Sequence, residues 1–351
     1  MRFHSFGLHP YERFLNTGCI RRGLWIELQE ETGRSSWAES APLLGRSVET
    51  LEEVKSQLER ALESSLTTEW SLDTYAHHLE RLKLFPSAAF GLESALLALL
   101  DPLPAVRVNV SALLQGTPQE VMAQAELRER EGYTSAKLKV GHLTLEHAEG
   151  LIRKLLGRFR LRLDVNRAWK RQEAERFFDA FEPNTFEYVE EPFQNPHELI
   201  HFSHPLAVDE SFPHDLTLTQ LEALPTLKAL IYKPTMQGGL SECRKLHQWT
   251  VRRGISLVLS SSFESEIGLS HIASLAYRLG IKTPIGIGTF HHFIHPSRMP
   301  GATLQHTAHD KKEGFEQPVM THSLESILRA SGIKATAGAQ ERTHHQLISA
   351  D

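Results

Sequence analysis

Short apolar strands recur at a regular interval through most of this 351-residue chain after residue 104. The spacing of roughly 20 to 30 residues leaves room for one strand, one helix and two short loops. The eight candidate strands span residues 106–112, 135–141, 160–166, 186–192, 206–211, 228–234, 255–262 and 283–289. Because eight parallel strands close a barrel, this rhythm predicts an α/β fold of the TIM-barrel type.

A doubly wound open sheet is the alternative architecture. Its dinucleotide-binding form would carry a glycine fingerprint after the first strand, and this chain has none there. The segment before the barrel is of another kind. Residues 21–41 predict two strands joined by a turn, and residues 47–65 predict a helix whose N-cap lies near Ser47. The N-terminal third is therefore expected to be α+β.

Bulk composition points to a small-molecule partner. The formal net charge is -5 with mixed signs, and the chain has no basic stripe for nucleic acid and no polybasic cluster for an anionic membrane. Cys19 and Cys243 lie far apart, as ordinary thiols of a reducing compartment would, and no signal peptide or membrane span is evident. These features predict a cytoplasmic protein, and nothing in the sequence assigns an oligomeric state. We interpret the histidines of "HHFIH" (291–295) and "HTAHD" (306–310) as solvated groups near loops.

The segment "SAKLKVG" (135–141) places Lys137 and Lys139 on one face of a strand. An exposed edge strand could carry two lysines to discourage pairing with another sheet. However, helical segments flank this strand, and strands of such βαβ units are normally covered on both faces. The lysines are therefore more consistent with a functional site.

Polar residues fall near the C-terminal end of one predicted strand after another. They are Lys137, Lys139, Asp164, Asn166, Glu190, Asp209, Lys233 and the run Ser260 to Ser262. In a barrel these strand ends share one mouth, where active sites of this fold are built. Scattered surface charge is the alternative, but it would not keep the period of the strands.

Three carboxylates without cysteine or histidine make an oxygen-rich site. We predict that Asp164, Glu190 and Asp209 bind one Mg²⁺, with Mn²⁺ able to replace it. Asn166 and Glu191 are expected to orient these ligands. Lys139 is expected to act as a general base, because the ammonium of Lys137, a metal cation and partial burial would all lower its pKa. Lys233 would face it across the mouth, an arrangement suited to removing a proton alpha to a carboxylate.

At this point the chain resembles the enolase superfamily, in the branch with muconate-lactonizing enzymes, dipeptide epimerases and o-succinylbenzoate synthases. The segments "KLK", "LRLDVNRAW", "VEEP", "VDES" and "YKP" follow that branch's order of lysines and metal ligands. "SSWAESAPLLGRSVETL" (35–51) resembles its capping segment. The resemblance implies a capping domain of residues 1–104, rejoined by residues 291–351, and a (β/α)7β barrel of residues 105–290.

Within the branch, "LRLDVNRAW" and "SSSFES" most resemble o-succinylbenzoate synthases. This implies Mg²⁺-dependent syn-dehydration of 2-succinyl-6-hydroxy-2,4-cyclohexadiene-1-carboxylate, a step of menaquinone synthesis. Lys139 would move the proton and Lys233 would stabilise the anionic ring. Ser260 and Gly286 match substrate contacts, and Arg162 would support the site.

Two other functions stay open. N-acylamino acid racemisation would use Lys139 and Lys233 as opposed bases, and a non-catalytic binding barrel would not need its lysines and carboxylates intact. Gly288 stands where relatives often have aspartate, which argues against a dipeptide epimerase.

Overall fold

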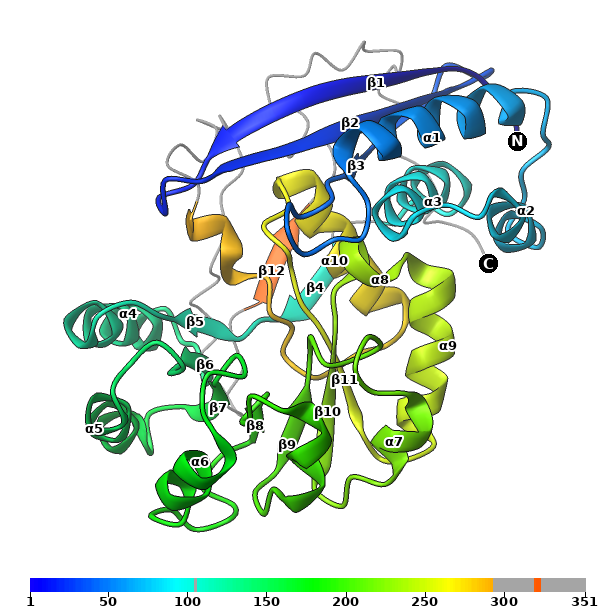
Figure 1. The fold of residues 1–351 in the computed structure, drawn as a ribbon. Helices are drawn as coiled ribbons and strands as arrows, with labels where there is room; N and C mark the ends of the chain where they lie inside the picture. The colour runs from blue at the N-terminus through cyan, green and yellow to red at the C-terminus, as the bar shows by residue number, and fades with distance from the viewer. Residues whose placement is uncertain (104–105, 293–318, 323–351) are drawn as a thin grey trace, which may run out of the picture.

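The computed structural model of the chain describes residues 1–103, 106–292 and 319–322. An N-terminal cap lies over one end of a barrel (Figure 1). The cap consists of β1 (Phe3–Phe14), β2 (Ile20–Glu30), β3 (Ser35–Ser40), α1 (Leu51–Ser65), α2 (Tyr75–Leu82) and α3 (Pro86–Leu100). Its strands form an antiparallel sheet in the order β1-β2-β3. Leu24, Ile26 and Leu28 are buried at every second position along β2, so one face of the sheet is buried against the helices.

Helix α1 begins later than the sequence indicated. Its N-cap is Thr50, whose side chain accepts a hydrogen bond from Glu53 N while the Glu53 carboxylate accepts one from Thr50 N. This reciprocal capping box satisfies two backbone donors that a Ser47 cap would leave unpaired. Ser47 has another role, because its Oγ accepts a hydrogen bond from Leu43 N at 2.8 Å and closes the preceding loop.

The barrel alternates strands with helices along the chain. Its sheet contains β5 (Ala112–Leu114), β6 (Ser135–Lys139), β7 (Arg160–Asp164), β8 (Tyr188–Glu190), β9 (Leu206–Val208), β10 (Leu227–Tyr232) and β11 (Ser256–Leu259). The first predicted strand, 106–112, is split, because β4 (Val106–Asn109) leaves this sheet and pairs in a separate two-stranded sheet. The segments between and after them form α4 (Pro118–Arg130), α5 (Leu145–Leu155), α6 (Arg171–Phe178), η1 (Pro196–His201), α7 (Leu218–Glu222), α8 (Pro234–Gln237), α9 (Leu240–Val251) and α10 (Glu266–Arg278). The predicted fold class, a barrel with an α+β cap, is confirmed.

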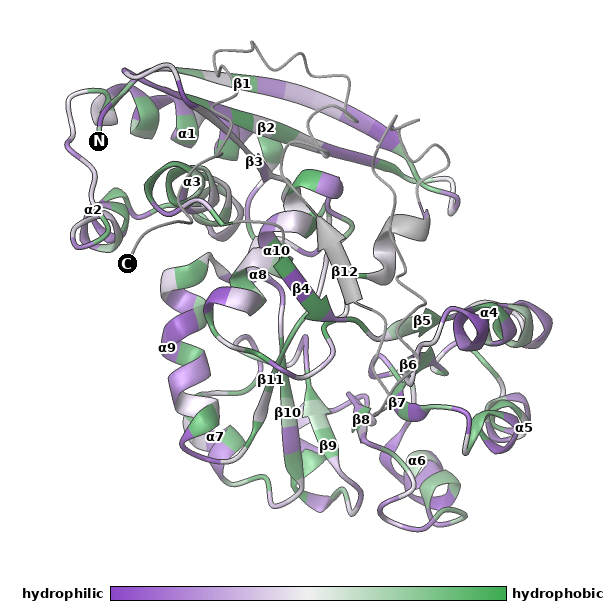
Figure 2. Cartoon of the chain, turned by 180° about the vertical axis from the view of Figure 1, so that it is seen from behind, coloured by the Kyte–Doolittle hydropathy of each residue, from purple (hydrophilic) through white to green (hydrophobic). Residues whose placement is uncertain are grey.

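The parallel register aligns the charged strand ends. Strands β5 to β11 form one sheet in chain order. Lys139 of β6 lies opposite Asp164 of β7, and Asp164 lies opposite Glu190 of β8. Figure 2 shows β9 as hydrophobic, whereas α4 and α9 carry both hydrophobic and hydrophilic residues. This pattern is expected for a covered parallel sheet whose helices keep one face in water.

The eighth predicted strand closes the barrel with only two isolated bridges. Ile285 pairs with Val110 on one side, and Gly286 pairs with Ser260 on the other. Pro284 has no N–H to donate, so a regular ladder cannot extend through this segment. It leads directly into η2 (Gly288–His292).

The predicted return of the C-terminal segment to the cap falls mostly outside the described residues. The part that is described, β12 (Val319–His322), pairs antiparallel with β4 in a two-stranded sheet separate from the barrel sheet. The boundaries at residues 104 and 290 and the return of residues 291–351 therefore stay predictions. The tail 338–351 lies outside the described residues.

Buried polar contacts fix the cap on the barrel. The Glu39 carboxylate of β3 accepts hydrogen bonds from Ser265 N at 3.0 Å and Gly268 N at 2.9 Å, at the start of α10. One turn further along α10, His271 Nε2 donates to the Trp37 carbonyl oxygen at 2.8 Å. Burial lowers the pKa of His271 to about 4, so the imidazole is neutral in the folded protein.

His271 should make stability depend on pH. Between its ordinary pKa of 6.5 and about 4, the unfolded chain binds a proton at this histidine and the folded chain does not. The contribution of His271 to the unfolding free energy should therefore fall as pH decreases, by about 1.4 kcal/mol per pH unit. Over this pH range, the unfolding free energy measured with urea should depend less steeply on pH for His271→Gln than for the unaltered protein. The glutamine amide can still donate to the Trp37 carbonyl. Equal slopes would contradict the assignment.

Candidate active site

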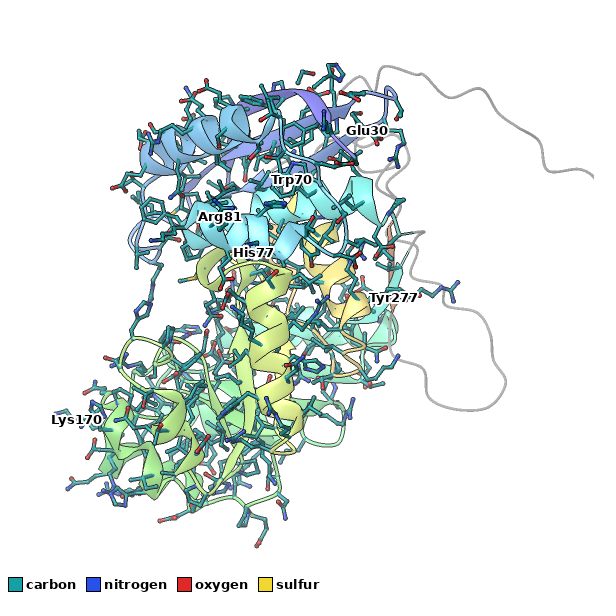
Figure 3. All side chains as sticks on the ribbon, turned by 90° about the vertical axis from the view of Figure 1, so that its right-hand side faces the viewer. Glu30, Trp70, His77, Arg81, Lys170 and Tyr277 are labelled. Carbon is teal, nitrogen blue, oxygen red and sulfur yellow. The ribbon has the colours of Figure 1, made fainter. Side chains whose placement is uncertain are left out.

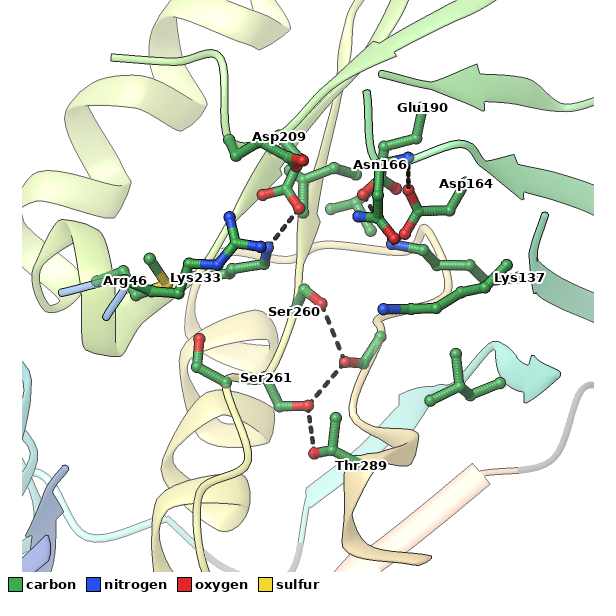
Figure 4. Close-up of a pocket in the computed structure, with 18 of the residues that line it drawn as sticks. Arg46, Lys137, Asp164, Asn166, Glu190, Asp209, Lys233, Ser260, Ser261 and Thr289 are labelled. Atoms are coloured by element: carbon green, nitrogen blue, oxygen red, sulfur yellow. Dashed lines mark hydrogen bonds and ion pairs between the residues drawn. The ribbon is translucent and has the colours of Figure 1, made fainter. Parts of the chain in front are cut away.

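Three carboxylates meet at the barrel mouth, as the sequence predicted. Asp164 and Glu190 end β7 and β8, Asp209 follows β9, and all three are buried. They line a cavity of about 500 Å³ that opens toward the cap. Figure 4 shows Asp164 and Glu190 on one side of this cavity and Asp209 beside Lys233. The parallel register produces this convergence, because it brings the carboxyl ends of neighbouring strands to one edge.

Two of the predicted lysines pair with these carboxylates. Lys137 Nζ lies 2.8 Å from Asp164 Oδ2 and 2.7 Å from Glu190 Oε1. Lys233 forms an ion pair with Asp209. Over the described residues no ready cluster of three ligands at metal spacing occurs, and the two ammonium groups lie among the carboxylates.

Lys139 differs from its neighbours. Burial, followed by the charge of Lys137, lowers the pKa of Lys139. Burial also disfavours the charge of Lys137, but Asp164 and Glu190 outweigh it and hold its pKa well above the ordinary value. For Lys233, Asp209 likewise outweighs burial and raises the pKa. Lys139 is thus the lysine most easily deprotonated, first because it is buried and second because of the Lys137 charge inferred from "KLK".

Glu191 holds the backbone that carries Asp209. Its carboxylate accepts hydrogen bonds from Asp209 N at 2.8 Å and Ser211 N at 3.0 Å. Burial, followed by the charge of Glu210, raises the pKa of Glu191 to about 7. Asn166 contacts the site through its backbone, because its N–H donates to Asp164 Oδ1 at 3.0 Å.

The residues predicted to contact the substrate or support the site line the same cavity. Arg162 is buried and its guanidinium binds both oxygens of Glu187 at 3.0 and 2.9 Å, and also the Pro284 carbonyl. The Arg162 guanidinium is therefore held in place by Glu187 and the Pro284 carbonyl. Ser260 Oγ donates to the Gly286 carbonyl oxygen at 3.2 Å. A Cβ at position 286 would come within 3.0 Å of that hydroxyl, so glycine leaves the room this contact needs.

Two residues of the site were missed or misread from sequence. His292 of "HHFIH" is half-buried, not solvated: its ring contacts Gln115 Nε2 at 2.9 Å and Asn16 Oδ1 at 3.0 Å, tying the β1–β2 turn to the barrel. Arg46 reaches the cavity from the cap. Its only signal was a charge at a position that the capping-segment pattern leaves unspecified. The "HTAHD" histidines lie outside the described residues.

Comparison with known proteins defines the class of protein. Residues 120–295 match the family model described as Enolase C-terminal domain-like, and residues 13–99 match that described as MenC, N-terminal domain. A solved dipeptide epimerase from Enterococcus faecalis has a TM-score of 0.73 at 19% identity, covering 92% of this chain and 97% of its own. Fold and charged mouth together define a member of the enolase superfamily.

Sequence similarity places the chain within that superfamily. It is 34% identical over 278 residues to o-succinylbenzoate synthase of Pectobacterium atrosepticum, covering 77% of this chain and 82% of the relative. The solved o-succinylbenzoate synthase of Thermosynechococcus elongatus, complexed with Mg in its active site, has a TM-score of 0.63 at 25% identity. That match covers 81% of this chain and 92% of the other. The chain belongs to the o-succinylbenzoate synthase family.

Replacing Lys137 with methionine tests the electrostatics of the mouth. The change removes the ammonium between Asp164 and Glu190 and leaves two buried carboxylates without a counter-charge. In the presence of a chelator we expect the unfolding free energy to fall by about 3 kcal/mol at neutral pH, and by less in acid, where the carboxylates take up protons.

The matched control is Lys170→Met. Lys170 is exposed at the end of the barrel far from Trp70 of the cap (Figure 3). Its loss should leave the unfolding free energy nearly unchanged. Equal stability of the two variants would contradict the predicted role of Lys137.

Proposed function

We propose that this protein is an o-succinylbenzoate synthase that dehydrates 2-succinyl-6-hydroxy-2,4-cyclohexadiene-1-carboxylate. The observation that carries the proposal is the pairing of one easily deprotonated lysine, Lys139, with a buried cluster of oxygen ligands in a single cavity. The relatives named o-succinylbenzoate synthase support the choice of reaction. Removal of a proton alpha to a carboxylate needs both a base and positive charge near the developing anion.

The carboxylates fit one Mg²⁺. Glu190 Oε2 is buried, and among the described residues it has no hydrogen-bond donor. Burial, followed by the charge of Asp164, raises the pKa of Glu190 well above its ordinary value, so this oxygen-rich cluster favours an added cation. Asp164, Glu190 and Asp209 would bind the ion, which would take the place of the lysine ammonium groups that contact them here. Mn²⁺ could occupy the same site. The bound cation supplies positive charge beside the substrate carboxylate.

The three lysines have different roles in the proposed reaction. Lys139 takes the alpha proton and then gives a proton to the departing hydroxyl, so that water leaves and the ring becomes aromatic. Lys137, beside Lys139, keeps the pKa of the base low. Lys233 remains protonated and stabilises the anionic ring from the other face. Glu191 and Asn166 orient Asp209 and Asp164 through their hydrogen bonds.

The matching relatives, which are named o-succinylbenzoate synthase, favour dehydration over racemisation. A two-base racemase would need Lys139 and Lys233 to exchange roles as proton acceptor and proton donor. Ser260 and Gly286 contribute a neutral wall for the succinyl chain, and Arg162 supports the floor below. A cytoplasmic location and the absence of nucleic-acid or membrane partners stay predictions. In the described part of the chain, no helix has the length and apolar character to cross a membrane.

Asp209→Asn should weaken metal binding and activity together. The neutral amide removes one anionic ligand and one partner of Lys233. We expect the Mg²⁺ dissociation constant from calorimetry to rise about tenfold or more, and o-succinylbenzoate formation to fall at least as far. Asp215→Asn, on the cavity rim, is the control. Activity that survives both Asp209→Asn and chelation would refute the metal site.

Proton exchange in D₂O distinguishes dehydration from racemisation. With Mg²⁺, we expect rapid formation of o-succinylbenzoate from the cyclohexadiene, detected by chromatography. We expect much slower exchange of the alpha proton of either enantiomer of an N-acylamino acid. Rapid exchange of both enantiomers without detectable o-succinylbenzoate would show that the protein is a racemase instead.

A further inference from the structure

Most cationic side chains that line the cavity already have carboxylate partners. Lys137 pairs with Asp164 and Glu190, and Lys233 pairs with Asp209. The remaining arginine pairs are Arg162 with Glu187 and Arg167 with Asp215. Among the lysines and arginines of the described lining, only Lys139 and Arg46 have no carboxylate partner. Because Lys139 serves as the base, Arg46 is the cation left for substrate.

A short, internally bonded loop presents Arg46 to the cavity. Arg46 N donates to the Leu43 carbonyl at 2.9 Å, and Leu43 N donates to Ser47 Oγ at 2.8 Å. Gly45 within this turn has φ +75, which glycine adopts without strain. Upstream, Arg21 donates to the carbonyls of Ala41 and Pro42, which anchors the loop to β2. The backbone that carries Arg46 is thus fixed before ligand arrives.

The Arg46 side chain points from this loop into the cavity, on the side of Lys233 (Figure 4). It is exposed, and no residue that the structure describes pairs with its guanidinium. A planar guanidinium presents two parallel N–H groups, the geometry that binds a carboxylate bidentately. An arginine held open to a cavity in this way is suited to an anionic ligand group.

The substrate of the proposed reaction has two carboxylates, and only the ring carboxylate is needed beside the base. The second ends the succinyl chain. Along the wall proposed for the succinyl chain, Ser260 and Ser261 already donate their hydroxyls to the Gly286 carbonyl, and position 288 is glycine, so this wall offers no charge for the terminal carboxylate. We infer that Arg46 binds the succinyl carboxylate and makes the site selective for dicarboxylates, an inference that rests on the proposed function.

Binding of the product and of a neutral-tailed analogue tests this role without turnover. The ligands are o-succinylbenzoate and o-butyrylbenzoate, in which a methyl group replaces the terminal carboxylate, titrated calorimetrically into the Mg²⁺-loaded protein. We expect Arg46→Gln to weaken o-succinylbenzoate binding about tenfold, because a charge-assisted pair is lost, and to leave o-butyrylbenzoate unchanged. Arg46→Lys should recover part of the loss. In turnover, Arg46→Gln should raise KM with little change in kcat.

The control is Arg60→Gln, since Arg60 is an exposed arginine of α1 outside the cavity lining. It should leave both affinities unchanged. If Arg46→Gln weakens the binding of both ligands equally, Arg46 only shapes the loop. If it weakens the binding of neither, Arg46 makes no contact with the ligand. Either result overturns the inference. Failure of the unaltered protein to dehydrate the cyclohexadiene would instead refute the proposed function, whatever the variants do.

Discussion

The mutual repulsion of three buried carboxylates governs this active site. Asp164, Glu190 and Asp209 are held together because β7, β8 and β9 are parallel neighbours whose ends meet at one edge. Such a cluster is unstable without positive charge nearby. Lys137 and Lys233 supply that charge in this structure, and in our proposal a divalent cation meets the same requirement.

This neutralisation leaves the two strand lysines with different properties. Lys137 is committed to Asp164 and Glu190, so it stays charged and lowers the pKa of Lys139 two residues away. Lys233 is committed to Asp209 across the mouth. In our proposal the same carboxylates bind the metal, and Lys139, which has no carboxylate partner in the described part of the chain, acts as the base.

The cap completes the site through contacts between residues far apart in the chain. Glu39 binds the start of α10, and His292 joins Asn16 of the β1–β2 turn to Gln115 of the barrel. These contacts join the cap to the barrel, and Arg21 of β2 holds the loop of Arg46 through the Ala41 and Pro42 carbonyls. The barrel provides the chemistry, and in our proposal the cap recognises the substrate tail.

The sequence by itself determined most of the strands, their order and the polar residues at their ends. A parallel sheet covered by helices needs an apolar run at each strand, and a functional mouth needs polar residues at the end of each strand, so both recur along the chain at the strand interval. It also placed Lys137 beside Lys139, since residues two apart on a strand share a face, but burial in the tertiary structure is the larger cause of the lowered pKa of Lys139. Only the tertiary structure decided the cap of α1 at Thr50, the two-bridge closure at Ile285 and Gly286, the bonding of His292 and the reach of Arg46 into the cavity. Each of these depends on which donors and acceptors meet after the cap has docked, and such meetings between distant residues leave no period in the sequence.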